Sequence, residues 1–277
     1  MIEIKNCSKS FGSVKAADKV SLEIGEREVF GLVGSNGAGK STLLRMAAGI
    51  LKPDEGEIQI DGENIYDNEK AKACIFYIPD DSYFPADYTP RDIADFYRYY
   101  YPKFDVQRFS KFLRQFHMDD KKRISTFSKG MRKQLLVLLG VSAGTKYLLC
   151  DETFDGLDPV MRQGVKSLFA SEIMGREFTP VIASHNLREL EDICDHVGLL
   201  YKGGILLSRD LEDMKFHIHK IQCVLKDKDQ ERQLQKEMDV LKTEHQGSLL
   251  LLTVRGTREQ IMELSLIHIS EPTRPRL

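Results

Sequence analysis

Residues 34–41 read GSNGAGKS, in which three glycines are followed by a lysine and a serine. This order fits the pattern G-x-x-x-x-G-K-[ST], a loop that wraps a phosphate group. The glycines at positions 34, 37 and 39 let the backbone turn where a side chain would clash. The backbone N–H groups from Asn36 to Thr42 can then point inward at an anion. The stretch therefore predicts a binding site for a polyphosphate.

The last two residues of the loop add charge and metal binding. Lys40 places a positive charge against the β- and γ-phosphates of a nucleotide, and the Ser41 hydroxyl is suited to bind Mg²⁺. A short apolar run at 28–33 precedes the loop and apolar residues with helical spacing follow it, so a strand and a helix flank the anion site. The alternative is a glycine-rich turn that matches the pattern by chance. The predicted nucleotide-binding residues of the loop are Gly34, Ser35, Asn36, Gly37, Ala38, Gly39, Lys40, Ser41 and Thr42.

Two adjacent carboxylates, Asp151 and Glu152, follow an apolar run that begins at Tyr147. This places them at the C-terminal end of a buried strand, the edge at which ligands bind in open α/β sheets. We expect Asp151 to hold Mg²⁺ directly or through water. We expect Glu152 to orient and partly deprotonate an attacking water molecule. The alternative is a surface Asp-Glu pair that only ends a strand.

His185 follows the next short apolar run, at 180–184, and can reach the same sheet edge. A donor at that edge can contact a γ-phosphate and hold the water-activating carboxylate in place. The alternative is that His185 is a polar residue whose hydrogen bonds are satisfied within the protein and which binds no ligand.

The elements that position these residues are of three kinds. Alternating patterns at 2–4, 20–24 and 57–60 predict half-buried antiparallel strands. From residue 146 to 208, short apolar strands alternate with helices that begin near Pro159 and Asn186, which implies a parallel α/β sheet. Residues 89–143 predict an all-helical insertion whose first helix begins at Thr89 and Pro90. We interpret the aromatic and aliphatic residues at helical spacing in this insertion as core rather than as a base-stacking platform: Ile93, Phe96, Tyr97, Tyr100, Phe109, Phe112, Leu113 and Phe116.

Beyond residue 208 the phosphate-site signals stop. Strand patterns at 221–225 and 249–254 flank a charged stretch, which predicts a small accessory α+β domain over 209–264. The last residues, 265–277, do not continue the preceding pattern and resemble a tail produced by sequencing-adapter read-through. We interpret them as non-native.

The composition is that of an ordinary soluble chain of 277 residues, 42% hydrophobic and 30% charged, with a net charge of −2. No basic excess favours nucleic acid as a partner. No apolar stretch approaches the length of about 18 residues that a membrane helix needs, and the first residues lack the apolar core of a signal peptide. Five scattered cysteines without a C-x-x-C pair indicate free thiols. We therefore expect a cytoplasmic protein whose role at a membrane requires a partner.

Two further stretches, FSKGM at 127–131 and FDGLD at 154–158, are ambiguous alone. Taken in order with the others, they make residues 1–208 resemble the ATP-binding cassette (ABC) family, the motor subunits of ABC transporters. GSNGAGKS stands at the Walker A loop, YLLCDE at Walker B, FSKGM at the signature, FDGLD at the D-loop and His185 at the switch histidine. The resemblance implies an α/β P-loop NTPase (RecA-like) core with an antiparallel β subdomain and a helical insertion.

The resemblance also implies how the site is assembled. Two cassettes, identical or closely related, face each other, and ATP with Mg²⁺ lies between one Walker A loop and the other chain's Ser128 and Gly130. Asp158 of the D-loop lies at the same interface. A separate integral membrane permease completes the transporter.

The chain departs from the family pattern at several positions. Phe127, Lys129 and Met131 replace the usual residues of the signature, and Asp80 stands where a glutamine is usual. A carboxylate can help to hold Mg²⁺ but cannot donate a hydrogen bond as an amide can. Phe11 stands where the family stacks an aromatic ring on adenine; the alternative is a core phenylalanine.

Three classes of function fit these features. A transporter motor subunit is favoured. The irregular signature resembles that of some bacterial exporter-type ATPases, and this resemblance implies an exporter. A soluble, non-transport member of the same superfamily, such as a translation or ribosome-associated factor, is the alternative. A small-molecule P-loop kinase would need neither the signature nor the switch histidine. Ser128 lies only 88 positions after Lys40, too few for the long coiled coils of DNA-repair members.

Overall fold

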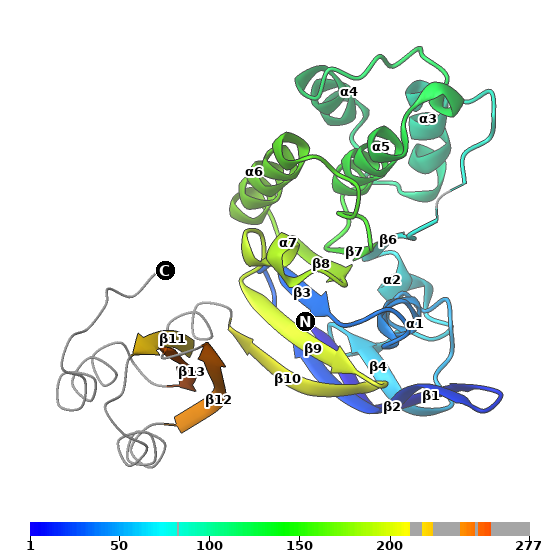
Figure 1. The fold of residues 1–277 in the computed structure, drawn as a ribbon. Coiled ribbons are helices and arrows are strands. Elements are labelled where there is room, and N and C mark those ends of the chain that lie inside the picture. The colour runs from blue at the N-terminus through cyan, green and yellow to red at the C-terminus, as the bar shows by residue number, and fades with distance from the viewer. Residues whose placement is uncertain (82, 211–217, 224–238, 247–248, 256–277) are drawn as a thin grey trace. The chain divides into compact units, whose positions relative to one another are not determined.

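The computed structural model describes residues 1–81, 83–210, 218–223, 239–246 and 249–255 of the chain. The chain divides into two compact units, Met1–Ser208 and Arg209–Leu277 (Figure 1). The first unit is a cassette of two sheets with a group of helices, and the second contains a small sheet. The tail predicted to be non-native, 265–277, lies outside the described residues.

The central sheet of the cassette has six strands in the order β10-β9-β3-β8-β7-β6. The five strands from β9 to β6 pair in parallel, and every residue of β3, β7 and β8 is buried. Burial on both faces explains why these strands are continuous apolar runs in the sequence. The strands are β3 (Phe30–Val33), β6 (Ile75–Ile78), β7 (Tyr147–Asp151), β8 (Thr179–Ser184), β9 (His196–Tyr201) and β10 (Gly204–Asp210).

The second sheet is antiparallel, in the order β2-β1-β4-β5. Its inward residues pack into one core with helix α1 (Lys40–Ala47) and the central sheet. The pattern at 2–4 predicted only the start of β1, because the alternation is interrupted by bulges after Ile4 while the backbone pairing continues to Phe11. The strands are β1 (Ile2–Phe11), β2 (Val14–Ile24), β4 (Glu55–Ile60) and β5 (Glu63–Asn64).

The region between β6 and β7 is helical, with α3, α4 and α5 grouped together in Figure 1. Thr89 caps α3 in a capping box with Asp92, as residue type and spacing predict. The helices of this region are α3 (Pro90–Tyr100), α4 (Val106–Gln115), the 3-10 helix η1 (Ile124–Thr126) and α5 (Lys129–Ser142). The short helix α2 (Glu69–Lys72) precedes β6.

The interpretation of the aromatic residues in this insertion as core is only partly correct. Phe109, Phe112 and Leu113 are buried in α4, but Phe96 and Tyr100 of α3 are 47% and 61% exposed. The buried face of α3 is narrow, comprising Pro90, Ile93 and Ala94, so the larger rings beside it reach solvent.

Helix α4 is tied to helix α6 (Pro159–Gly175) by a buried carboxylate. Glu172 of α6 is 5% exposed and forms ion pairs with Arg108 of α4 and with Arg176, the latter at 2.8 Å. Arg176 also donates hydrogen bonds to the carbonyls of Val141 and Thr145, and burial lowers its pKa to about 10. These contacts join the helical insertion to the core. The short helix α7 (Leu187–Glu191) follows β8.

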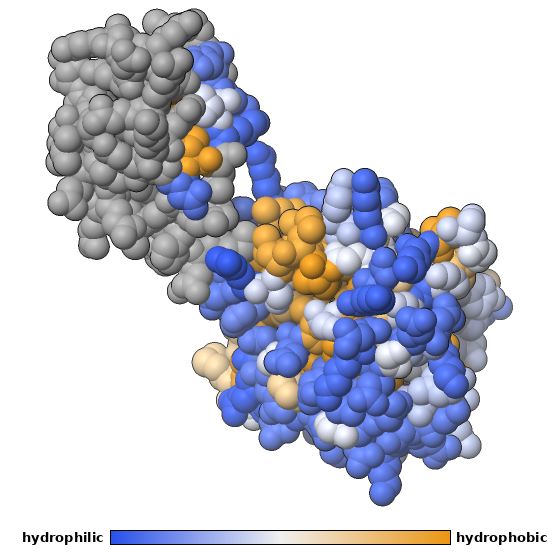
Figure 2. Space-filling view, turned by 90° about the horizontal axis from the view of Figure 1, so that it is seen from below, coloured by the Kyte–Doolittle hydropathy of each residue, from blue (hydrophilic) through white to orange (hydrophobic). Residues whose placement is uncertain are grey.

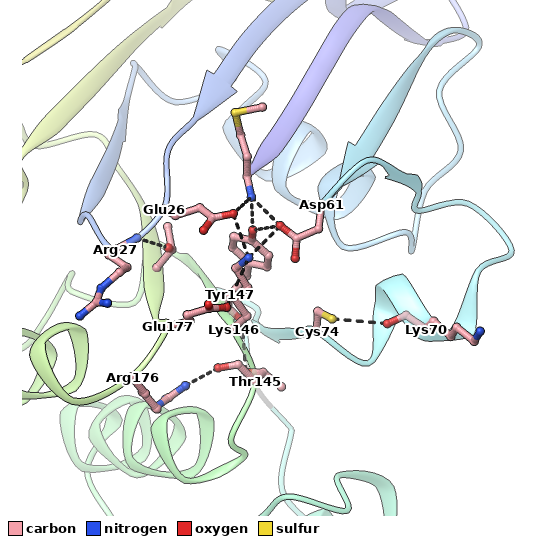
Figure 3. Close-up of polar contacts among 12 residues, drawn as sticks. Glu26, Arg27, Asp61, Lys70, Cys74, Thr145, Lys146, Tyr147, Arg176 and Glu177 are labelled. Carbon is pink, nitrogen blue, oxygen red and sulfur yellow. Dashed lines mark hydrogen bonds and ion pairs between the residues drawn. The ribbon is translucent and has the colours of Figure 1, made fainter.

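A second ionic cluster holds the N-terminal end of β7, opposite the end that carries the acidic pair (Figure 3). The Asp61 carboxylate accepts hydrogen bonds from the Met1 amino group, from Lys146 Nζ at 2.9 Å and from the Tyr147 hydroxyl at 2.6 Å. Burial opposes ionisation of Asp61, but these hydrogen bonds prevail and lower its pKa to about 2. The cluster attaches β7 to the antiparallel sheet.

The second unit contains a three-stranded antiparallel sheet in the order β11-β13-β12. Two of its strands match the predicted patterns, but β12 was missed because its residues, DVLKTEHQ, lack an apolar alternation. The helical content expected of this unit falls outside the described residues. The strands are β11 (Ile218–Cys223), β12 (Asp239–Gln246) and β13 (Leu249–Arg255).

Hydrophilic residues cover most of the cassette face seen in Figure 2. None of the helices in the described part of the chain combines the length and apolar character of a membrane span. Cys7, Cys74, Cys150 and Cys194 are free thiols.

Replacing Glu172 by glutamine should destabilise the cassette, because Arg108 and Arg176 would keep their charges without a counter-ion. We expect a loss of roughly 3 kcal/mol in the free energy of unfolding, measured by urea denaturation. Glu177→Gln is the matched control, since Glu177 is 67% exposed and pairs loosely with Lys146 at 3.6 Å. Equal, small effects of the two variants would contradict a stabilising role for the cluster.

Candidate functional site

The glycine-rich loop connects the end of β3 to the start of α1. Gly37 and Gly39 have φ angles of 78° and 105°, a region that favours glycine. A Cβ on Gly39 would lie 2.1 Å from the carbonyl oxygen of Ala16, and one on Gly34 would lie 2.6 Å from that of Leu200. Close backbone approach therefore requires glycine at both positions.

Lys40 is buried at the first position of α1, and its Nζ atom lies inside the loop. The Nζ atom donates a 2.7 Å hydrogen bond to the carbonyl of Gly34 and pairs with Glu152 Oε1 at 3.0 Å. The loop differs from the expectation at Ala38, whose amide donates to the carbonyl of Ser35 at 3.0 Å instead of remaining directed at an anion.

Ser41 and Asp151 present two oxygen ligands to one point. The Ser41 hydroxyl donates to Asp151 Oδ1 at 2.9 Å, and the Tyr77 hydroxyl donates to Oδ2 at 3.2 Å. Burial raises the pKa of Asp151, and the hydrogen bonds from Ser41 and Tyr77 oppose this rise. Mg²⁺ binds through one or two carboxylates together with phosphates and water, so a hydroxyl beside a carboxylate fits this ion.

Tyr77 was missed by the sequence reasoning. It is the only polar side chain in the run IFYI of β6, and this was the available signal. Its hydroxyl also accepts a 3.4 Å hydrogen bond from Arg45 Nε of α1. Burial is the main cause that raises the pKa of Tyr77 to about 12, so the phenol remains a donor to Asp151 at neutral pH.

Glu152 connects Lys40 to His185. Its backbone has a φ of 47°, a region that few residues other than glycine adopt. Glu152 Oε2 lies 2.9 Å from Nδ1 of His185, while Oε1 pairs with Lys40. The hydrogen bond with Glu152, and then its charge, raise the pKa of His185. The ends of β3, β7 and β8 thus bring together the lysine, both carboxylates and the histidine.

This arrangement has the parts needed to hydrolyse a phosphoanhydride. Lys40 can neutralise phosphate charge, and the Ser41–Asp151 pair can hold Mg²⁺ against the same phosphates. Glu152 is suited to accept a proton from water, and His185 can keep its carboxylate oriented. When bound, the metal ion would stabilise the charge that develops on the transferred phosphoryl group.

The signature and D-loop residues form a separate group. The Ser128 hydroxyl caps α5 by accepting from the Met131 amide at 3.2 Å, and a Cβ on Gly130 would lie 3.1 Å from the carbonyl oxygen of Gly156. The Asp158 carboxylate caps α6 by accepting from the Met161 amide at 2.8 Å. Among the described residues, no hydrogen bond or ion pair links these three predicted site residues to the phosphate loop. Phe127 is buried, so it fills the apolar position at which the family has leucine.

Asp80 and Phe11 are the two remaining predicted site residues. The Asp80 carboxylate pairs with Lys133 Nζ at 3.2 Å, so its predicted contact with Mg²⁺ stays a prediction. Phe11, at the end of β1, is 51% exposed, and the alternative of a core phenylalanine is wrong. Its stacking on adenine also stays a prediction.

Comparisons with known proteins agree with this geometry. The family model described as ABC transporter matches residues 17–155. The ABC transporter ATP-binding protein YtrB of Bacillus subtilis is 35% identical over 80% of this chain and 76% of its own length. The bacitracin transport ATP-binding protein BcrA of Bacillus licheniformis is 30% identical over 78% of this chain and 71% of its own length.

Solved structures show the same fold. The ATP-binding subunit of an ABC transporter superposes with a TM-score of 0.70 at 23% identity, covering 78% of this chain and 92% of that chain. A dimeric post-hydrolysis state of an ATP-binding cassette bound to ADP and Pi gives a TM-score of 0.67 at 19% identity, covering 76% of this chain and 99% of that chain.

The cassette fold and the nucleotide site define a chain that belongs to the ABC transporter family. It is an ATP-binding subunit of that family, with the ATPase activity of its class.

Replacing Glu152 by glutamine should abolish most turnover and retain ATP binding. Glutamine keeps the shape of the side chain but cannot accept a proton, a loss that typically costs about 10²–10⁴-fold in rate. ATP affinity should not fall, because the competitor for Lys40 is removed. Phosphate release and equilibrium ATP binding measure the two effects.

Glu189→Gln is the matched control, since Glu189 is a neighbouring carboxylate that contacts Ser184 and Arg162 instead of Lys40. Wild-type turnover in Glu152→Gln would contradict the role of Glu152 as the base.

Proposed function

We propose that this chain is the ATP-hydrolysing motor subunit of an ABC transporter, acting as a cassette dimer that drives a separate membrane permease. The contacts that join Lys40, Glu152 and His185, beside the Ser41–Asp151 pair, carry this proposal. ATP and Mg²⁺ are the cofactors that suit these groups. Nucleic acid is not an expected partner.

The exposure of the signature supports a shared site. Ser128 and Lys129 are exposed at the N-terminus of α5. This end of the helix carries partial positive charge and suits a phosphate. In the proposed dimer, Ser128 and Gly130 of one cassette contact the ATP held by Lys40 of the other, and Asp158 lies at the same interface. A cassette with the same fold has been solved as a dimer.

The aromatic surface of α3 supports a permease partner. Phe96, Tyr99 and Tyr100 are 47%, 83% and 61% exposed. The centroid of the Tyr100 ring lies 5.0 Å from that of the Phe96 ring and 5.1 Å from that of the Tyr99 ring. A contiguous exposed aromatic cluster is typical of a protein–protein contact. Docking here would hold the chain at the cytoplasmic face of the membrane through the permease.

We propose export as the direction, on the basis of the irregular signature with Lys129 and Met131. Relatives of similar identity are named for lipopolysaccharide export and for methionine import, so the direction rests on the signature alone. The alternative is a soluble, non-transport ATPase, and a pull-down from membranes separates the two. Recovery of an integral membrane partner supports transport, whereas recovery of ribosomes supports the alternative.

Mixing two inactive variants tests the shared site. Ser128→Arg should block closure of the dimer because arginine is too large for the position of a hydroxyl at a phosphate. Lys40→Ala should remove the cation that faces the β- and γ-phosphates. In a heterodimer of the two, one site carries both lesions and the other carries neither, so ATP hydrolysis should return on mixing. Heterodimers that form without any hydrolysis would contradict the proposed geometry.

Removing two exposed rings tests the permease surface. Tyr99→Ser with Tyr100→Ser should leave the ATPase rate of the isolated chain unchanged and prevent co-purification with the integral membrane partner that the wild-type chain recovers. Tyr66, which is 37% exposed on the cassette but outside α3, gives the matched control Tyr66→Ser. Retention of the permease by the double variant would show that α3 is not the docking surface.

A further inference from the structure

Lys133 is a charged residue inside the buried part of α5. Its side chain is only 3% exposed, and the helix continues with apolar buried residues from Leu135 to Leu139. Lysine is almost never buried to this extent unless it is paired. Replacing a buried ion pair by apolar residues is often neutral or stabilising, so packing alone does not account for a lysine here.

The ammonium group of Lys133 joins two segments of the core. Its Nζ atom donates a 2.5 Å hydrogen bond to the backbone carbonyl of Glu152 and pairs with Asp80 Oδ1 at 3.2 Å. Glu152 follows β7, and Asp80 follows β6 on the segment that leads into α3. One cation therefore connects the helical insertion, this segment and the turn that carries the catalytic carboxylate.

The carbonyl that Lys133 binds belongs to a residue in an unfavourable backbone conformation. The φ angle of Glu152 is 47°, and such residues persist only where their surroundings hold them. Its amide donates to the carbonyl of Ala183 at 3.0 Å, and its carbonyl accepts from Lys133. These two bonds fix the direction in which the side chain leaves the backbone, toward Lys40 and His185.

We propose that Lys133 is a positioning residue for ATP hydrolysis: it holds the peptide of Glu152 so that the carboxylate is aligned for proton transfer, and Asp80 anchors its ammonium group. This inference rests on the proposed function, because it requires Glu152 to be the base. Lys133 then acts on the rate through Glu152, without contacting nucleotide.

Methionine in place of Lys133 tests this role, since it preserves the length of the side chain and removes the charge. The misplaced carboxylate should lower kcat by about 10²-fold. ATP affinity, measured by equilibrium binding, should be unchanged. The free energy of unfolding should fall only slightly, because the partner left behind, Asp80, is 53% exposed and remains hydrated. A purely structural role would instead reduce stability and ATP affinity along with the rate. Lys111→Met, at an exposed lysine of α4, is the matched control and should change none of these quantities.

A second background distinguishes indirect from direct action. In the Glu152→Gln chain, Lys133→Met should cause no further change in turnover or ATP affinity, because residues that act as a unit are non-additive. Asp80→Asn should lower kcat by less than Lys133→Met, since an amide oxygen still accepts from the ammonium group.

The outcomes separate this inference from the proposed function. Wild-type kcat in Lys133→Met, or loss of ATP affinity equal to its loss of kcat, would overturn the inference. A larger loss in Asp80→Asn than in Lys133→Met would also overturn it, because Asp80 would then act on its own. Wild-type turnover in Glu152→Gln alone would instead overturn the proposed function.

Discussion

The ion pair between Lys40 and Glu152 is the contact on which the site depends. It joins the loop after β3 to the turn after β7, two segments that are 112 positions apart in the chain (152 − 40). It forms because parallel strands present their C-terminal ends at one edge of the sheet. β8 lies between β3 and β7 in the sheet, and His185, which follows it, completes the group from the same edge. A sheet with another strand order would separate these side chains.

The charges of this group are balanced by their surroundings. Glu152 is shared between Lys40 and His185, and Asp151 is held by the hydroxyls of Ser41 and Tyr77. Both carboxylates lie at the end of a fully buried strand, where an unpaired anion would be costly. Phosphates would have to compete with Glu152 for Lys40, whereas the Ser41–Asp151 pair is already oriented for Mg²⁺, which reduces the reorganisation required on that side of the site.

Sequence reasoning identified the parts of the site that depend on local pattern. The glycine positions, the acidic pair after an apolar run and the capping residues Thr89 and Ser128 each follow from residue type and spacing. It did not find Tyr77 or Lys133, because their roles depend on neighbours that are distant in sequence, Asp151 and Asp80. Strand β12 and the second half of β1 were missed for another reason: their pairing partners, rather than an alternation of their own, determine that they are strands. The exposed rings of α3 were wrongly assigned to the core. Helical spacing shows which residues share one face of the helix, but it does not show how much of that face the neighbouring elements bury.

The ion pairs of Glu172 have a mechanical consequence. Arg108 and Arg176 hold the base of the helical insertion where α4 meets α6, and buried charges do not separate from their partners without a large cost. If the insertion moves relative to the sheet, a rotation about this contact would therefore cost less than a detachment. Elements far from the pivot travel furthest in such a rotation, whereas those beside it hardly move. In such a rotation the contact of α4 with α6 would be the fixed point, and one small angle would give different displacements along the insertion.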